Sequence, residues 1–166
     1  MLLIGVDHPI HEKIAWAENT FKELGGELLA DRVVYERLEA YKKTIDDTWE
    51  EMKGLGVLDV CTDCAVNGGG SCCGEGIENR FDGTLLLINL LMGAKLPEER
   101  PDNTSCFFLG KNGCTIPARH TICINYICKR LKRKIGEKNL KTLGERIIQE
   151  SDASFFLEDA IKRRLL

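Results

Sequence analysis

CTDCAVNGGGSCC, residues 61–73, and CFFLGKNGCTIPARHTICINYIC, residues 106–128, hold all eight cysteines of this chain. Thiolates are soft anionic ligands, and four of them suit Zn²⁺ or an iron–sulfur cluster. Eight thiols allow two closed four-cysteine sites, or one site with spare thiols. We therefore expect a metal-binding segment, whose candidate ligands are Cys61, Cys64, Cys72, Cys73, Cys106, Cys114, Cys123 and Cys128.

The first stretch combines a Cys-x-x-Cys pair with two adjacent cysteines. The spacing of Cys61 and Cys64 lets both sulfurs reach one ion across a tight turn. Glycines follow, and the sequence predicts a loop over residues 57–80 that can wrap closely around an ion. Adjacent side chains in an extended chain point in opposite directions, so Cys72 and Cys73 can serve different sites.

The second stretch predicts a hairpin followed by a helix. Residues 106–109 and 114–116 are expected as strands, because Asn112-Gly113 between them is a strong hairpin signal. A helix is expected from about residue 122 to residue 135. Cys123 and Cys128 would lie about 140° apart on a regular helix, so one of them should lie at or before its start.

Three other uses of the cysteines compete with metal binding. Disulfides are one, although eight cysteines allow 105 pairings and an intracellular setting disfavours them. A thioredoxin-like redox pair at Cys61 and Cys64 is another, but Cys64 leads into a glycine-rich loop instead of a strand–motif–helix unit. Simple burial is the third, and it does not explain why all eight fall between residues 61 and 128.

Apolar residues at helical spacing dominate the segments before and after the cysteine segment. Apolar residues recur at helical spacing from residue 9 to residue 24, with Asp7 as the expected N-cap and Gly25-Gly26 as the expected end. Further helices are expected over 30–53, over 83–92 after the cap Asp82, and from Gly136 towards residue 164 with interruptions at Gly144 and Ser151-Asp152. The predicted fold is mainly α with a small β-hairpin, in which helices frame a cysteine-rich, loop-rich metal-binding core. One domain, 1–166, would comprise a helical hairpin (1–56), the cysteine core (57–128) and a C-terminal helical segment (129–166).

Composition and charge are those of an ordinary globular chain of 166 residues with a net charge of -3. Residues 1–60 carry 13 acids and 7 bases, whereas residues 129–166 carry 6 acids and 11 bases. The apolar start before Asp7 is too short for a signal peptide, and no apolar run approaches the roughly 20 residues of a membrane span. We expect a cytoplasmic protein without a membrane partner.

The cysteine segment resembles the YkgJ-type cysteine-cluster family, described as CxxCxxCC or zinc- or iron-chelating proteins. The resemblance rests on Cys61-x2-Cys64 with Cys72-Cys73, and on the stretch from Cys106 to Cys128 with Arg119 and Tyr126 at family spacing. It implies that all eight cysteines bind a metal or a cluster. Seven residues instead of the usual two precede Cys72, and His120 replaces a proline. His120 is a candidate ninth donor, a hydrogen-bond partner of a sulfur, or a surface residue.

An iron–sulfur protein, carrying a 4Fe–4S type cluster for electron transfer or for cluster or metal handling, is the favoured function. Glycine-rich loops with N–H groups free to reach sulfurs favour a cluster. The alternative is a structural zinc protein that binds partners, among them nucleic acid through the basic run 129–134. No nucleotide-binding or nucleophile motif indicates an independent active site, so an enzymatic role would be that of an oxidoreductase or redox-complex component. The redox or protein partner and the oligomeric state stay open.

Overall fold

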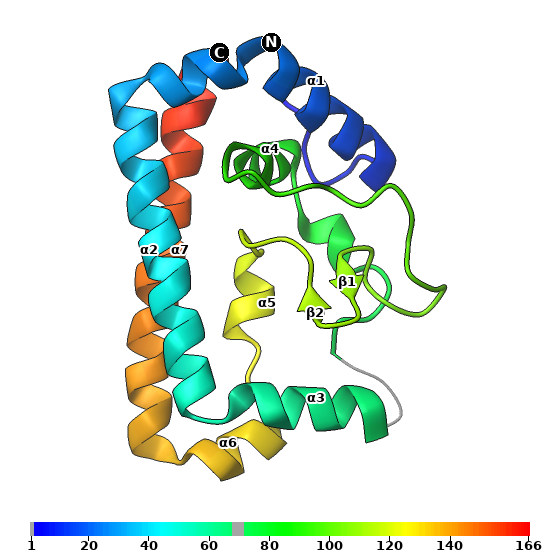
Figure 1. Ribbon diagram of the computed structural model, residues 1–166, viewed down its shortest axis with the longest axis vertical. Coiled ribbons are helices and arrows are strands. Elements are labelled where there is room, and N and C mark those ends of the chain that lie inside the picture. Colours follow the sequence, from blue (N-terminus) through cyan, green and yellow to red (C-terminus); the bar gives the residue numbers. More distant parts are fainter. Residues whose placement is uncertain (1, 68–71) are drawn as a thin grey trace.

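The computed structural model describes residues 2–67 and 72–166, apart from the side chains of residues 64–66. Within these residues the fold is mainly helical with one two-stranded antiparallel sheet (Figure 1), which confirms the predicted mainly α class with a small hairpin. Its elements are α1 (Ile10–Ala30), α2 (Arg32–Gly54), α3 (Val57–Asn67), the 3-10 turn η1 (Ile77–Arg80), α4 (Gly83–Leu91), β1 (Leu109–Gly110), β2 (Gly113–Cys114), α5 (Thr121–Asn125), α6 (Lys129–Ile135) and α7 (Glu137–Leu165). None of the helices in the described range is both long and apolar enough to cross a bilayer.

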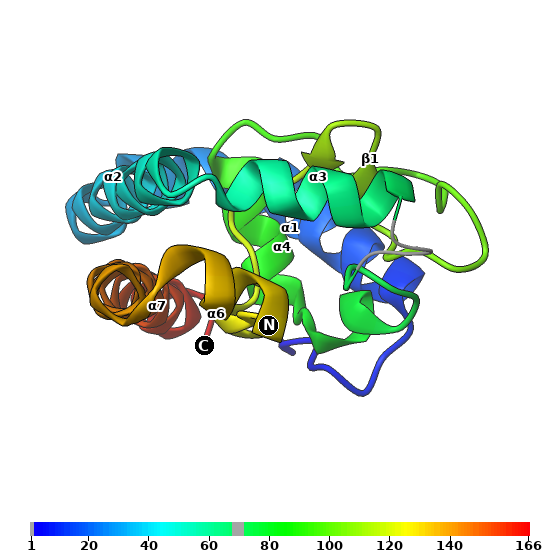
Figure 2. The same ribbon diagram turned by 90° about the horizontal axis from the view of Figure 1, so that it is seen from below.

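The long helices α2 and α7 lie side by side and form one wall of the molecule (Figures 1 and 2). Asp31 caps α2, because its side chain accepts a hydrogen bond from the Val34 amide at 3.0 Å. One stripe of α2 is buried at helical spacing, and it faces a similar stripe of α7. The buried members are Val34, Leu38, Tyr41, Ile45, Thr48 and Met52 on α2, and Leu143, Ile147, Glu150, Ser154, Leu157, Ala160, Ile161 and Leu165 on α7.

The larger core surrounds α4, which packs against α1 and touches α7. Its residues 85–88 are at most 4% exposed, so this short helix is apolar on every side. Gly83 opens α4 where a Cβ atom would lie 2.3 Å from Ile4 and 2.5 Å from Trp16. A side chain at this position would push the N-terminal segment away from α4.

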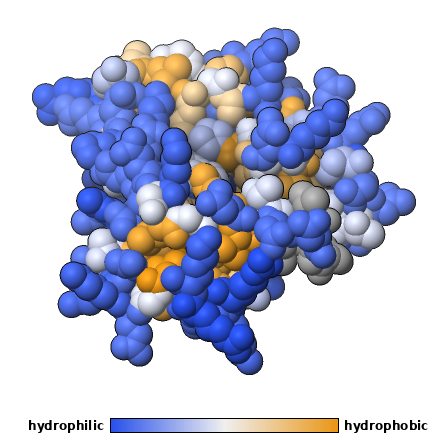
Figure 3. All heavy atoms as spheres, turned by 60° about the horizontal axis from the view of Figure 1, so that its bottom comes forward, coloured by the Kyte–Doolittle hydropathy of each residue, from blue (hydrophilic) through white to orange (hydrophobic). Residues whose placement is uncertain are grey.

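A second, smaller core lies at the opposite end, where α6 packs against α3 (Figure 1). It contains Met52, Val57, Val60, Ile124, Leu131, Ile135, Leu143 and Ile147. Seen from this end, apolar atoms reach the surface within a frame of hydrophilic side chains (Figure 3). Neighbouring residues of α5 divide between the two cores, because Cys123 packs against the larger one and Ile124 is buried in the smaller one.

The expected ends of the first helix are wrong at both termini. Its N-cap is Pro9, and Asp7 makes no cap. The helix also continues through Gly25-Gly26 to Ala30, and the chain bends at Asp31. Leu28 is 3% exposed and extends the buried stripe of Ile10 and Ile14, so its burial offsets a cost of about 1 kcal/mol for each helical glycine.

Two predictions in the cysteine segment are also wrong. Residues 57–67 form α3 instead of a loop, because Val57 and Val60 are buried in the smaller core. The helix expected over 122–135 is broken into α5 and α6 by extended backbone at Tyr126. Cys123 therefore lies within α5, whereas Cys128 caps α6, with its sulfur accepting a hydrogen bond from the Leu131 amide at 3.5 Å.

Other local predictions are confirmed. Asp82 caps α4 by accepting from the Leu85 amide at 2.8 Å. The hairpin forms around the expected turn, although its strands are short, with Leu109 opposite Cys114.

After Gly136, α7 runs without a break through Gly144 and Ser151-Asp152, so the expected interruptions are wrong.

Candidate metal centre

Four cysteines from separate segments meet at the larger core: Cys73, Cys106, Cys114 and Cys123, here called the inner cysteine group. The amide of Cys106 donates to the carbonyl of Cys73 at 2.8 Å, and Gly74 pairs with Ser105 beside it. The Leu109 amide donates to the Cys106 carbonyl at 3.0 Å, and Leu109 faces Cys114 across the hairpin. These contacts link three members of the group through the backbone.

The fourth member, Cys123, lies on α5 and interacts electrostatically with the other three thiols. Each of the six pairs within the inner group is close enough for one thiolate to act on the other. Burial raises the pKa of Cys106 to about 11 and that of Cys123 to about 12, and it also raises the pKa of Cys114. The neighbouring thiols add to these increases, since like charges oppose ionisation. A bound cation would instead favour the ionised thiolates and displace their protons.

The remaining cysteines lie towards α3 and α6 and form the outer cysteine group: Cys61, Cys64, Cys72 and Cys128. Cys61 and Cys72 are exposed and act on each other electrostatically, and Cys128 packs against the smaller core. A hydrogen bond with Cys73 raises the pKa of Cys72, and partial desolvation of its sulfur, in a residue that is exposed as a whole, adds to the increase. The Cys64 side chain lies outside the described part of the structure, although its backbone belongs to α3.

An ion pair brings Cys128 towards the cysteines of α3. Asp63, between Cys61 and Cys64, accepts from Arg130, two residues after Cys128. The start of α6 therefore lies beside the part of α3 that carries Cys61 and Cys64. The tight turn expected at Cys61 and Cys64 is absent, because the backbone of both residues belongs to α3.

The sulfurs are neighbours without forming a closed coordination sphere. Among the described side chains, no group of three or more His, Cys, Asp or Glu is arranged to hold a metal ion, and the seven described cysteines form no disulfide. Rotation about the Cα–Cβ bond moves each sulfur without moving the backbone. The four thiols of the inner group are soft donors of the kind that bind zinc or iron, but their side chains are not arranged around one ion in this structure.

Buried charge fixes the two segments that bring Cys73 and Cys106 together. Glu78, 1% exposed, pairs with Arg100 and accepts from the Gly76 amide at 3.0 Å. Arg100 also donates to the Ser105 carbonyl at 2.7 Å. One ion pair thus ties the segment after Cys73 to the segment before Cys106.

Asp102 supports the same segment from its outer side. Its carboxylate accepts hydrogen bonds from the amides and hydroxyls of Thr104 and Ser105, each at 2.8 Å. These bonds lower the pKa of Asp102 to about 2. Because they stabilise the charged form, the turn that leads into Cys106 depends on an ionised Asp102.

We expect acid to weaken this turn. The folded pKa of Asp102 lies below the unfolded value of about 3.9, so its contribution to stability is full above about pH 4 and is lost as the pH falls towards 2. Asp102→Asn should therefore destabilise the protein at pH 6 and lose its effect near pH 2. The measurement is urea unfolding across this range beside Glu98→Gln, an exposed acid of the same loop. An equal loss of stability in Asp102→Asn at pH 6 and at pH 2 would refute the assignment.

His120 has a structural role that the sequence does not indicate. Its Nδ1 accepts from the Ile122 amide at 3.1 Å and caps α5, so Nε2 carries the proton of the neutral ring. Burial lowers the pKa of His120, and the positive charge of Arg80 adds to the decrease. The ring is therefore neutral at pH 7, and it positions the first turn of the helix that carries Cys123.

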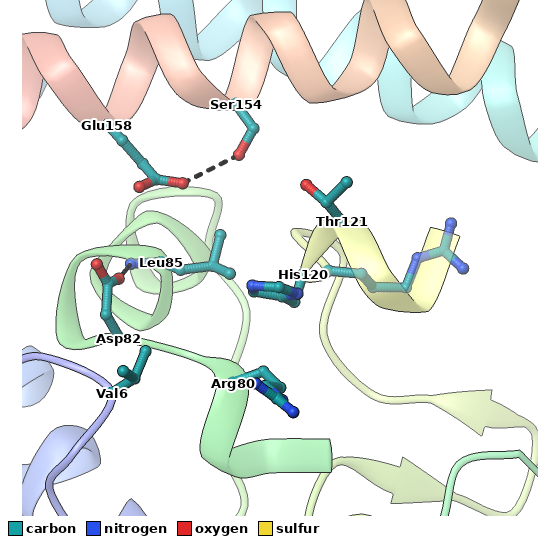
Figure 4. A pocket seen from close by; sticks show the side chains of 9 residues that line it. Val6, Arg80, Asp82, Leu85, His120, Thr121, Ser154 and Glu158 are labelled. Carbon is teal, nitrogen blue, oxygen red and sulfur yellow. Dashed lines mark hydrogen bonds between the residues drawn. The ribbon is translucent and has the colours of Figure 1, made fainter. Parts of the chain in front are cut away.

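His120 also faces a small polar cavity of about 160 Å³ (Figure 4). The cavity is lined by Val6, Arg80, Asp82, Leu85, Arg119, His120, Thr121, Ser154 and Glu158. Its two acidic residues are paired with Lys162, which lies outside the lining and donates to Asp82 at 3.2 Å and to Glu158 at 3.1 Å. Among the described residues, no cysteine lines this cavity.

The basic run 129–134 forms α6 and its last turn. Arg130 is engaged with Asp63, and Lys134 lies beside Gly56. Lys129, Lys132 and Arg133 are exposed. Basic side chains in the last turn of a helix interact favourably with the helix dipole. This run therefore has a structural use without a nucleic acid.

Sequence reasoning missed Glu150 and its neighbours. Glu150 is fully buried in the stripe of α7, where Ile147 precedes it and Ser154 follows. A carboxylate at a core position of an amphipathic helix was the signal that could have identified it. Tyr41 faces it from α2, and Arg119 acts on both through its charge.

Comparisons with protein families, with curated proteins and with solved structures find no match for this chain.

Proposed function

We propose that this protein binds an iron–sulfur cluster at the inner cysteine group and serves in electron transfer or in cluster or metal handling. The observation that carries the proposal is the convergence of Cys73, Cys106, Cys114 and Cys123 from four segments on one side of the larger core. Four thiols in one place match the ligand set of a 4Fe–4S cluster. The resemblance to the YkgJ-type cysteine-cluster family agrees with this use.

The partial burial of the inner group suits a cluster. Cys106 is 6% exposed, and the other three members are half-buried against apolar side chains. An apolar, solvent-poor setting is one of the features through which proteins set cluster potentials. When bound, the cluster would supply one-electron chemistry, and this chain would hold it, exclude water and set the local charge.

The outer cysteine group is the candidate for a second metal site. It combines two exposed thiols with Cys128 at the N-terminus of α6, so a metal held there would exchange more readily than one at the inner group. Zinc at such a site, next to the exposed bases of α6, is the arrangement that the nucleic-acid alternative requires. Salt-sensitive binding to generic DNA or RNA that Lys132→Gln and Arg133→Gln abolish would support this alternative.

Anaerobic purification followed by an absorption spectrum and elemental analysis tests the proposal. We expect a brown protein with broad visible absorption, and with iron and acid-labile sulfide in equal amounts. Dithionite should bleach the absorption reversibly. A colourless protein with zinc and no sulfide would reject the cluster and retain the thiolate site. A protein with neither metal would reject both.

A further inference from the structure

The cavity of about 160 Å³ beside His120 lies where η1, α4, α5 and α7 meet (Figure 4). The His120 ring points from the start of α5 into the space between Leu85 and Arg80, and Glu158 and Ser154 face this space from α7. A polar space of this size holds several ordered waters or one small ligand. The hydrogen-bonding groups of its lining determine which ligand it suits.

The two carboxylates of the lining already have partners. Asp82 accepts hydrogen bonds from the Leu85 amide at 2.8 Å and from Lys162 at 3.2 Å. Glu158 accepts from Lys162 at 3.1 Å and from the Ser154 hydroxyl at 3.3 Å. Because a cation of the protein itself pairs with both acids, the lining does not call for a cationic ligand.

The donors of the lining, in contrast, are largely unused. His120 accepts from the Ile122 amide through Nδ1, which leaves its Nε2–H without a partner in the described part of the chain. Within the same residues, the Arg80 guanidinium forms neither an ion pair nor a hydrogen bond, and the Thr121 hydroxyl has no hydrogen-bond partner. Nε and Nη2 of Arg119, which is 8% exposed, are buried without partners as well. The free groups of the lining are therefore donors.

The charges around the cavity also favour an anion. Arg80, Arg119 and Lys162 carry three positive charges, and the lining carries two carboxylates. The Arg119 guanidinium lies 4.2 Å from the centroid of the Trp49 ring, a contact that holds its charge in place. Guanidinium N–H groups form charge-assisted hydrogen bonds with the oxygen atoms of phosphates and carboxylates.

We propose that this cavity binds a small oxyanion, a phosphate or a carboxylate, between the Arg80 guanidinium and Nε2–H of His120. The Thr121 hydroxyl supplies a further donor, and Arg119 supplies a fixed positive charge at the wall. The site goes beyond the proposed function and does not depend on a bound metal. It places a ligand against the residue that caps α5, the helix that carries Cys123.

The test is NMR of the histidine ring protons of the full chain at pH 7, titrated with inorganic phosphate and separately with acetate at constant ionic strength. The chain has three histidines, and only His120 lines the cavity among the described residues. We expect its resonance to shift and to saturate, and those of His8 and His11 to stay unchanged. Arg80→Gln should weaken binding about tenfold, because it removes a charge-assisted hydrogen bond.

Arg133→Gln is the matched control for Arg80→Gln. Arg133 is also an exposed arginine, but it lies on α6 and outside the cavity lining. We expect this variant to bind the anion as the wild type does. His120→Asn keeps a side chain that caps helices well and removes Nε2–H, so it should also weaken binding about tenfold in calorimetric titrations.

Saturation by phosphate alone would assign the site to phosphates, and saturation by acetate alone would assign it to carboxylates. Shifts of the His120 resonance that rise linearly with both anions would overturn the inference. Equal weakening by Arg80→Gln and Arg133→Gln would overturn it too, because the anion would then bind the basic surface in general. If His120→Asn fails to fold, Arg80→Gln still tests the site, since Arg80 is exposed.

Discussion

Replacing Cys106 and Cys123 together with serine should remove nearly all iron and sulfide that the inner cysteine group binds. The substitution replaces two of its four thiolates with hydroxyls, which are poor ligands for iron in a cluster. These two members come from different segments, the one before the hairpin and α5, so no single neighbouring thiol can replace both. Iron and sulfide per protein after anaerobic reconstitution, together with the visible absorption, measure the effect.

The matched control is the double variant Cys61→Ser/Cys128→Ser in the outer group. It removes the same number of thiols, from the helices of the smaller core. We expect it to keep the inner cluster and its visible absorption, while any zinc at the outer group decreases. Equal losses in the two double variants would contradict the division into inner and outer groups. Retention of iron by Cys106→Ser/Cys123→Ser would contradict the assignment of the inner group.

Arg100→Ala should produce the largest loss of stability among single substitutions near the site. Glu78 is 1% exposed, and removal of Arg100 leaves its carboxylate buried without a partner charge. Such changes cost about 3–5 kcal/mol. In a chain of this length that corresponds to a decrease in Tm of roughly 10 °C. Because Arg100 also holds the Ser105 carbonyl, the variant should bind less iron at the inner group.

Arg163→Ala is the control for Arg100→Ala. Arg163 pairs with Asp159 one turn away on α7, and both side chains are largely exposed. The expected loss of stability is far smaller than that of Arg100→Ala, because solvent screens this exposed pair. Adding Glu78→Gln to Arg100→Ala should recover part of the lost stability, because the buried charge is then removed as well. Chemical unfolding that places Arg100→Ala within about 1 kcal/mol of the wild type would show that the ion pair is not a structural link.

Local sequence patterns predict the elements whose signals are themselves local. Asp82 and the apolar run after it define α4, and Asn112-Gly113 defines the hairpin. The patterns fail where burial against a distant segment determines whether a helix forms or continues. Leu28 extends α1 past two glycines, and Val57 and Val60 form a helix because the smaller core covers them. Tyr126 interrupts the expected helix between α5, which faces both cores, and α6, which faces the smaller one.

The sequence identifies the cysteines as a set, and tertiary contacts divide them. Cys72 and Cys73 are adjacent, yet Cys73 packs against the larger core and Cys72 is exposed, as the alternation of an extended chain allows. Arg119 is visible in the sequence only as part of a family resemblance. Its neighbours Tyr41 and Glu150 come from helices that are far apart in the chain, so only the fold brings the three together.

Anomalous diffraction at the iron edge, from crystals grown anaerobically, tests the central claim most directly. We predict a peak whose nearest protein atoms are the sulfurs of Cys73, Cys106, Cys114 and Cys123. A peak at the same place at the zinc edge alone would contradict the cluster and keep the thiolate site. No metal peak there, or disulfides between these sulfurs, would contradict the account as a whole.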